Sequence, residues 1–108
     1  MRRDDVIAML RANADTIRGF GVRALYLYGS AARDEAGGLS DVDLFADVEY
    51  GPFGFVPYME LRDFLRSLFQ RPVDITTREA LHPDLKDRIV KSAIKVFDER
   101  QIDPVAAE

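Results

Sequence analysis

Two aspartates separated by a single residue stand in "SDVDLFADV", a stretch whose apolar residues otherwise alternate as they do in a β-strand. Residues two apart on a strand point to the same side, so Asp41 and Asp43 are expected to place their carboxylates next to each other. Two carboxylates at such a short distance raise each other's pKa unless a cation neutralises both. Mg²⁺ is commonly held by one or two carboxylates together with substrate phosphates, so the pair predicts a magnesium site.

A Gly-Ser pair, Gly29 and Ser30, follows the apolar run "VRALYLY" about ten residues before these aspartates. Glycine lets the chain turn sharply off a strand and lets a ligand approach the backbone, and serine at this point predicts the N-cap of a short helix. The exposed N–H groups and the positive end of such a helix suit an anion. Phosphate on one side and carboxylates on the other together predict a site for a nucleoside triphosphate.

A third carboxylate, Asp74, lies in the short apolar run "VDIT" (73–76). If this run is a strand that pairs beside the one carrying Asp41 and Asp43, Asp74 completes an acidic triad. It is then expected either to bridge the metal or to take the proton of the nucleophile. The alternative is an aspartate that only caps or turns the chain.

Apolar spacing predicts the elements that position these residues. Helices are expected from residue 4 to the glycines at 19 and 21, briefly over 30–34, from 57 to Pro72, and from 84 onward. Strands are expected over 22–29, 41–48, 73–76 and 93–97; the alternative for 93–97 is the end of the last helix. This order predicts an α/β (α+β) fold, a small mixed sheet covered by helices. Residues 1–98 are expected to form the domain, and 99–108 are expected to form a C-terminal tail that is frayed or bound by a partner.

Composition limits the function further. A chain of 108 residues predicts one domain, and its net charge of −4 does not favour binding to nucleic acid, which needs a basic stripe. No run of about 18 apolar residues and no leader is present, so neither a membrane span nor a signal peptide is expected. The absence of cysteine excludes disulfides and thiolate zinc sites and is compatible with the cytoplasm, which is the expected location.

In this order, "GSAAR", a spacer, "SDVDL" and the later "VDI" resemble the signature of the DNA polymerase beta-like nucleotidyltransferase superfamily. The length and single-domain layout are similar to its minimal nucleotidyltransferase (MNT) antitoxins, which are paired with HEPN-domain toxins. The resemblance covers nearly the whole chain. It implies that ATP and Mg²⁺ are used, that the triphosphate is held by Gly29, Ser30 and Arg33, and that the metal ligands are Asp41, Asp43 and Asp74, the last of these as third ligand or base. The alternative for Arg33 is a position on a solvated helix face.

The resemblance also implies a reaction and a partner. AMP is transferred from ATP to a protein hydroxyl, expected to be a tyrosine of the HEPN-type toxin, with which the chain forms a hetero-oligomer as its antitoxin. One departure is Asp34, which stands after Arg33 where the family has glycine, although Gly37 and Gly38 follow closely. An antitoxin that neutralises its toxin by binding alone remains the alternative. Transfer to a small molecule such as an aminoglycoside is disfavoured, because such enzymes carry an additional domain for the acceptor.

Two further segments carry specific expectations. The loop "EYGPFGFVPY" (49–58) displays Tyr50, Phe53 and Phe55, and is expected to stand beside the active site and receive the protein acceptor. The alternative is that these rings fold back on the core. His82, the sole histidine, is expected to cap the helix that follows it.

Overall fold

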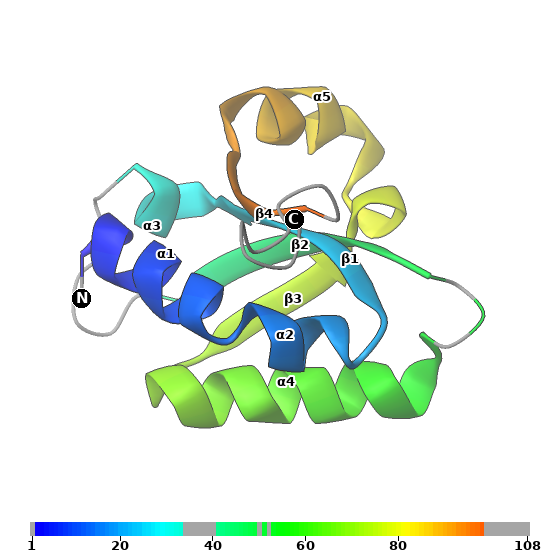
Figure 1. Ribbon diagram of the computed structural model, residues 1–108. Coiled ribbons are helices and arrows are strands. Elements are labelled where there is room, and N and C mark those ends of the chain that lie inside the picture. The colour runs from blue at the N-terminus through cyan, green and yellow to red at the C-terminus, as the bar shows by residue number, and fades with distance from the viewer. Residues whose placement is uncertain (1, 34–40, 50, 52, 99–108) are drawn as a thin grey trace, which may run out of the picture.

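The computed structural model describes residues 2–33, 41–49, 51 and 53–98. They form a four-stranded sheet with helices on both of its faces (Figure 1). In chain order the elements are α1 (Arg3–Ala12), α2 (Ala14–Arg18), β1 (Val22–Tyr28), α3 (Gly29–Ala32), β2 (Val42–Val48), α4 (Phe55–Phe69), β3 (Val73–Thr77), the 3₁₀ helix η1 (Arg78–Ala80), α5 (Pro83–Ser92) and β4 (Ile94–Phe97). The expected fold, a small mixed sheet covered by helices, is confirmed.

The strands lie in the order β3-β2-β1-β4. β1 is antiparallel to both β2 and β4, whereas β2 and β3 are parallel. Parallel neighbours need a crossover connection, and α4 provides it. Across the described residues, no helix is long and apolar enough to cross a membrane.

The two faces of the sheet differ in what they carry: one packs on the core and the other carries the acidic residues. Leu25, Leu27 and Leu44 are fully buried and belong to the core, which also takes in buried side chains of α1, α2 and α4. The alternate residues of β1 and β2 point to the other face, over which α5 lies (Figure 1). The acidic residues are therefore kept off the core by the two-residue repeat of the strand, as the sequence predicted.

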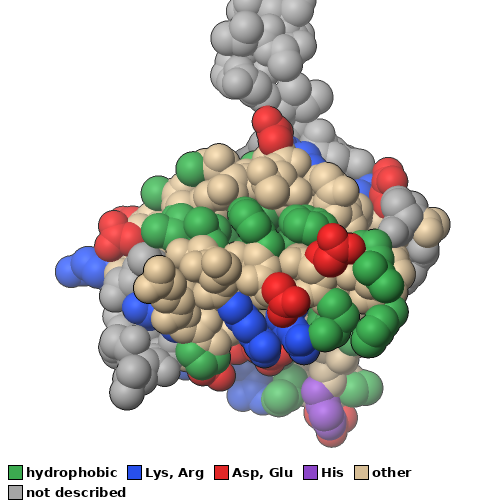
Figure 2. Space-filling model, turned by 90° about the horizontal axis from the view of Figure 1, so that it is seen from below, with side chains coloured by type: hydrophobic (Ala, Val, Ile, Leu, Met, Phe, Trp, Pro, Cys, Tyr) green, Lys and Arg blue, Asp and Glu red, His purple; other side chains and the backbone are tan. Residues whose placement is uncertain are grey.

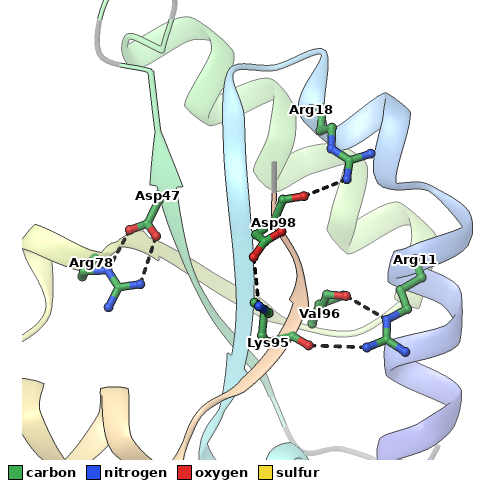
Figure 3. A network of polar contacts seen from close by, with 7 residues as sticks. All are labelled: Arg11, Arg18, Asp47, Arg78, Lys95, Val96 and Asp98. Atoms are coloured by element: carbon green, nitrogen blue, oxygen red, sulfur yellow. Dashed lines mark hydrogen bonds and ion pairs between the residues drawn. The ribbon is translucent and has the colours of Figure 1, made fainter. Parts of the chain in front are cut away.

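Phe45 shares the polar face yet is fully buried. Its ring stacks on that of Tyr26 at a centroid distance of 4.7 Å, and the guanidinium of Arg78 lies 5.2 Å from its ring centre. Arg78 is held there by Asp47, whose carboxylate accepts two hydrogen bonds of 2.7 and 2.9 Å (Figure 3). An aromatic layer thus continues along the sheet face from the acidic residues.

The helix boundaries differ in detail from those expected. The first helix is divided at Asn13 into α1 and α2, and α4 begins at Phe55, two residues before Pro57. Proline is tolerated there because N–H groups in the first turn of a helix have no intrahelical acceptor. The prediction that Ser30 is an N-cap is wrong: Tyr28 holds that position, and Ser30 lies inside α3.

Two expectations at the C-terminal side are confirmed. His82 caps α5, because its Nδ1 accepts a hydrogen bond of 3.1 Å from the N–H of Asp84. The segment after α5 forms the strand β4, which lies at one edge of the sheet.

Arginines from the first two helices hold this edge strand. Arg11 Nε donates a 2.7 Å hydrogen bond to the carbonyl of Val96, and Arg18 donates one of 3.1 Å to the carbonyl of Asp98 (Figure 3). Such contacts satisfy backbone groups at the edge of a sheet, where pairing with another chain is otherwise a risk.

The face seen from the side of α4 carries hydrophobic, acidic and basic side chains close together (Figure 2). Two of the exposed large hydrophobic residues, Phe55 and Val56, belong to the first turn of α4. The N-terminal turn of α4 therefore exposes two large apolar side chains.

Candidate active site

The turn after β1 depends on glycine for two reasons. Gly29 has a φ of +73°, a conformation that other residues adopt only at a cost in free energy. In addition, a Cβ at this position would collide with the Oδ2 of Asp43. The turn and the carboxylate thus pack against each other, so that two of the predicted site residues, Gly29 and Asp43, are in contact.

Three polar residues form a row across neighbouring strands. Tyr28 of β1 is opposite Asp43 of β2, and Asp43 is in register with Asp74 of β3. Since paired residues on neighbouring strands point to the same face, these side chains lie beside one another. The pairing of β3 beside β2, on which the predicted triad depends, is therefore present. Asp41 is exposed and stands immediately before β2.

Negative charge accumulates along this row. Partial burial raises the pKa of Asp43, the charges of Asp74 and Asp41 raise it further, and the positive charge of Arg33 lowers it. Burial together with the charges of Asp43 and Asp74 also raises the pKa of Tyr28 to about 12, so that its phenol stays neutral at pH 7. A cation bound here would relieve the repulsion that acts on Asp43.

The donor set fits a hard divalent cation that shares its ligands with a substrate. Within the described ranges, no three acidic or histidine side chains are grouped so that they hold an ion by themselves. Magnesium does not require such a group, because it usually takes one or two carboxylates and completes its coordination with phosphate oxygens and water. Asp43 and its acidic neighbours supply oxygen ligands of this kind.

A pocket of about 260 Å³ opens between α5 and the turn after β1. Tyr28, Gly29 and Arg33 line one side, and four residues of α5, Leu85, Arg88, Ile89 and Ser92, line the other. Arg88 was not among the predicted site residues, because an arginine on a helix is usually only solvated. The available signal was spacing: the four α5 residues recur at intervals of three and four, which places them on one helix face.

Not every predicted residue is brought to this pocket, and its lining does not include Asp41, Asp43 or Asp74. Ser30 is half-buried in α3 and does not line it. Asp34, Gly37 and Gly38 lie in the segment 34–40, outside the described residues.

The prediction that the loop 49–58 stands beside the active site is wrong. Asp43 is near the start of β2, whereas this loop follows the other end of the strand, and Figure 1 shows α3 and the loop at opposite ends of the sheet. Phe53 packs against the core and lies edge-on to Tyr58, while Phe55 is exposed. Tyr50 lies outside the described residues.

Comparisons with known proteins agree with this geometry. The family model described as "Nucleotidyltransferase domain" matches residues 10–96. The protein adenylyltransferase MntA of Thermococcus cleftensis is 29% identical over 94 residues, which cover 86% of this chain and 94% of that protein.

Two solved structures are similar in fold. One, described as a "putative minimal nucleotidyltransferase", has a TM-score of 0.72 and 30% identity, and the match covers 87% of this chain and 95% of that chain. A crystal structure described as "the toxin-antitoxin with AMP-PNP" has a TM-score of 0.61 and 20% identity, over 94% of this chain and 77% of that chain. The expected resemblance to nucleotidyltransferases is confirmed.

Proposed function

Because this chain belongs to the minimal nucleotidyltransferase family, we propose that it transfers AMP from ATP to a hydroxyl group of a protein toxin, and so acts as an antitoxin. The observation that supports this most is the row in which Gly29 contacts Asp43 and Asp43 pairs with Asp74. A module that only bound its partner would gain nothing from carboxylates held together against their mutual repulsion.

The relatives support the class of reaction and of partner. The relative from Thermococcus cleftensis is named a protein adenylyltransferase, and a solved toxin–antitoxin structure with an ATP analogue shares the fold. We infer a toxin partner for this chain on that basis. More specifically, we propose that the partner is a HEPN-type toxin and that the acceptor is the hydroxyl of one of its tyrosines.

The proposed reaction assigns one task to each residue. The acceptor oxygen forms a bond to the α-phosphorus of ATP, the bond from that phosphorus to the bridging oxygen breaks, and pyrophosphate leaves with the electron pair. Asp74, exposed on the edge strand β3, takes the hydroxyl proton. Gly29, Ser30 and Arg33 hold the triphosphate.

Asp41 and Asp43 are the proposed ligands of Mg²⁺. When bound, the ion supplies positive charge that stabilises the phosphate oxygens as negative charge develops on the leaving group. The carboxylate of Asp43 lies against the turn at Gly29, in the space that a side chain there would need.

Binding without catalysis is the second candidate. The exposed Phe55 and Val56, with 75% and 62% of their surfaces accessible, favour a contact with some partner, because exposed apolar side chains on one helix turn suit an interface. This contact would lie away from the acidic row, at the other end of β2 (Figure 1).

The test uses labelled ATP, Mg²⁺ and the proposed toxin partner, to be sought in the reading frame next to the one for this chain. The wild type should add one AMP to the toxin, detected by intact mass, whereas Asp43→Asn and Asp74→Ala should not. Both variants should still bind the toxin in a pull-down. If the wild type neutralises the toxin with no increase in its mass, binding alone is the function.

A further inference from the structure

The pocket between α5 and the β1–α3 turn borders the acidic row and contains two arginines. We propose that this pocket binds the β- and γ-phosphates of ATP, and that Arg88 of α5 acts with Arg33 to hold the pyrophosphate as it leaves. This inference rests on the proposed nucleotidyl transfer and adds a substrate-binding residue from a helix that the signature motifs do not include.

Gly29 connects the pocket to the reacting centre. It lines the pocket, and the space where its side chain would stand is taken by the carboxylate of Asp43. A ligand in the pocket is therefore next to the carboxylates. If the α-phosphate reacts at those carboxylates, an adjoining part of the same nucleotide must extend into the neighbouring space.

The charge of the pocket selects which part this is. Arg33 and Arg88 reach it from two different elements, the end of α3 and the middle of α5. A guanidinium matches phosphate oxygens in a two-pronged geometry, and two of them offset much of the charge of a diphosphate group. A neutral nucleoside has no need of two cations.

Arg88 is exposed and has no carboxylate partner of its own among the described residues. The other arginine of the pocket acts on the acidic row directly, since the charge of Arg33 lowers the pKa of Asp43. The pocket thus brings a second positive charge close to an environment that otherwise has an excess of negative charge.

The attachment of α5 is consistent with a ligand beneath it. No residue of this helix is buried, although it lies over the sheet (Figure 1). Phosphates held between Arg33 and Arg88 would connect α5 to the turn after β1. Without a ligand, this connection rests only on the partly exposed side chains of α5. ATP is therefore expected to slow amide hydrogen exchange in 83–92.

The volume of the pocket limits what it holds. About 260 Å³ is below the range of roughly 300–1,000 Å³ that is usual for sites enclosing a whole ligand of this size, so only part of ATP fits. Leu85 and Ile89 in the same wall could instead contact the purine ring, and the experiment below separates the two arrangements.

Calorimetric titrations of the full chain with ATP, AMP and pyrophosphate, all with Mg²⁺, test the proposal. Arg88→Ala should weaken binding of ATP and pyrophosphate by about tenfold or more, with AMP affected less than about twofold. Arg88→Lys should recover part of the loss, since it restores the charge but not the two-pronged contact. Lys91→Ala is the matched control, because it removes one positive charge from the exposed side of the same helix and should change none of the three affinities.

The outcomes are distinct. Equal losses for AMP and ATP in Arg88→Ala would show that the pocket holds the nucleoside, and unchanged affinities would show that it holds no part of ATP; either result overturns the inference while leaving the proposed transfer intact. A wild type that binds no ATP at all overturns both. Melting temperature and circular dichroism of each variant confirm that the fold is retained.

Discussion

The carboxylate of Asp43 occupies the space that a side chain on Gly29 would need. These two signature residues, one in the turn after β1 and one on β2, are therefore not independent: the first has no side chain because the carboxylate of the second is close. This relationship predicts that the glycine is required for catalysis more strictly than for folding.

Replacement of Gly29 by alanine tests this prediction. The left-handed backbone costs about 1–2 kcal/mol for a residue with a side chain, which gives a modest fall in melting temperature. The new methyl group also displaces the Asp43 carboxylate, so AMP transfer should be lost almost completely. Gly51→Ala is the control, since nothing lies within 4 Å of a side chain there. A Gly29→Ala variant with normal transfer would contradict the assignment.

The raised pKa of Asp43 predicts how stability depends on pH. The folded chain binds this proton more tightly than the unfolded chain does, so the contribution of Asp43 to stability is present at acid pH and is lost as the pH rises through the raised pKa. Above that range, the charged carboxylate faces Asp74 and Asp41 as well as the cation Arg33. Asp43→Asn should therefore melt at a higher temperature than the wild type at pH 7.

The gain in Asp43→Asn should shrink as the pH falls toward the ordinary aspartate range, about 4. Thermal melts of both proteins between these limits measure the difference at each pH. Asp87→Asn, an exposed change on α5, serves as the control and should show no such trend. An Asp43→Asn variant that is less stable than the wild type at pH 7 would show that the carboxylate stabilises the apo fold.

Addition and removal of metal should reverse this order. A ligand at 100 times its dissociation constant stabilises the folded state by about 2.7 kcal/mol, so ATP with Mg²⁺ should raise the melting temperature of the wild type. Asp43→Asn should not respond, and EDTA should abolish the shift in the wild type. An equal shift in both proteins would exclude Asp43 as a metal ligand.

Two phenylalanines of the segment 49–58 are expected to behave differently. Phe53 packs against the core, so Phe53→Ala should lower the free energy of unfolding by about 1–3 kcal/mol. Phe55 is exposed, and Phe55→Ala should change stability little. Urea unfolding of both variants checks the pair. Similar losses in the two variants would mean that Phe55 is also part of the core.

Asp47 and Arg78 are predicted to be coupled energetically. Their two hydrogen bonds, of 2.7 and 2.9 Å, form beside the rings of Tyr26 and Phe45. A double-mutant cycle with Asp47→Asn and Arg78→Gln should give an interaction energy near the upper end of the usual range for surface pairs, about 1 kcal/mol. Arg78→Lys should lose most of it, because an ammonium cannot make the two-pronged contact. A coupling near zero would show that the aromatic layer holds Arg78 without Asp47.

The sequence was sufficient to predict the sheet and the acidic row, because strand alternation places Asp43 on the polar face whatever the neighbours are. It could not give the register that aligns Asp43 with Asp74, since register arises from pairing between distant segments. Arg88 was missed because its role also depends on a distant segment. An exposed arginine on a helix is identified as part of a site only when the residues on the opposite side of the pocket are known. The position of the loop 49–58 was predicted wrongly, because the loop follows the strand that carries Asp43. It leaves the far end of β2, whereas Asp43 is near the start of that strand.

The hydrogen bond from Arg11 to Val96 joins residues 85 positions apart in the chain. During synthesis, β1 leaves the ribosome long before β4, its partner on one side, exists. A nascent chain therefore exposes an unpaired edge of β1 until β4 has emerged. Until then, Arg11 and Arg18 lack the carbonyl acceptors of Val96 and Asp98. The sheet is completed only after β4 has been synthesised, and until then the unpaired edge of β1 is exposed to aggregation and proteolysis.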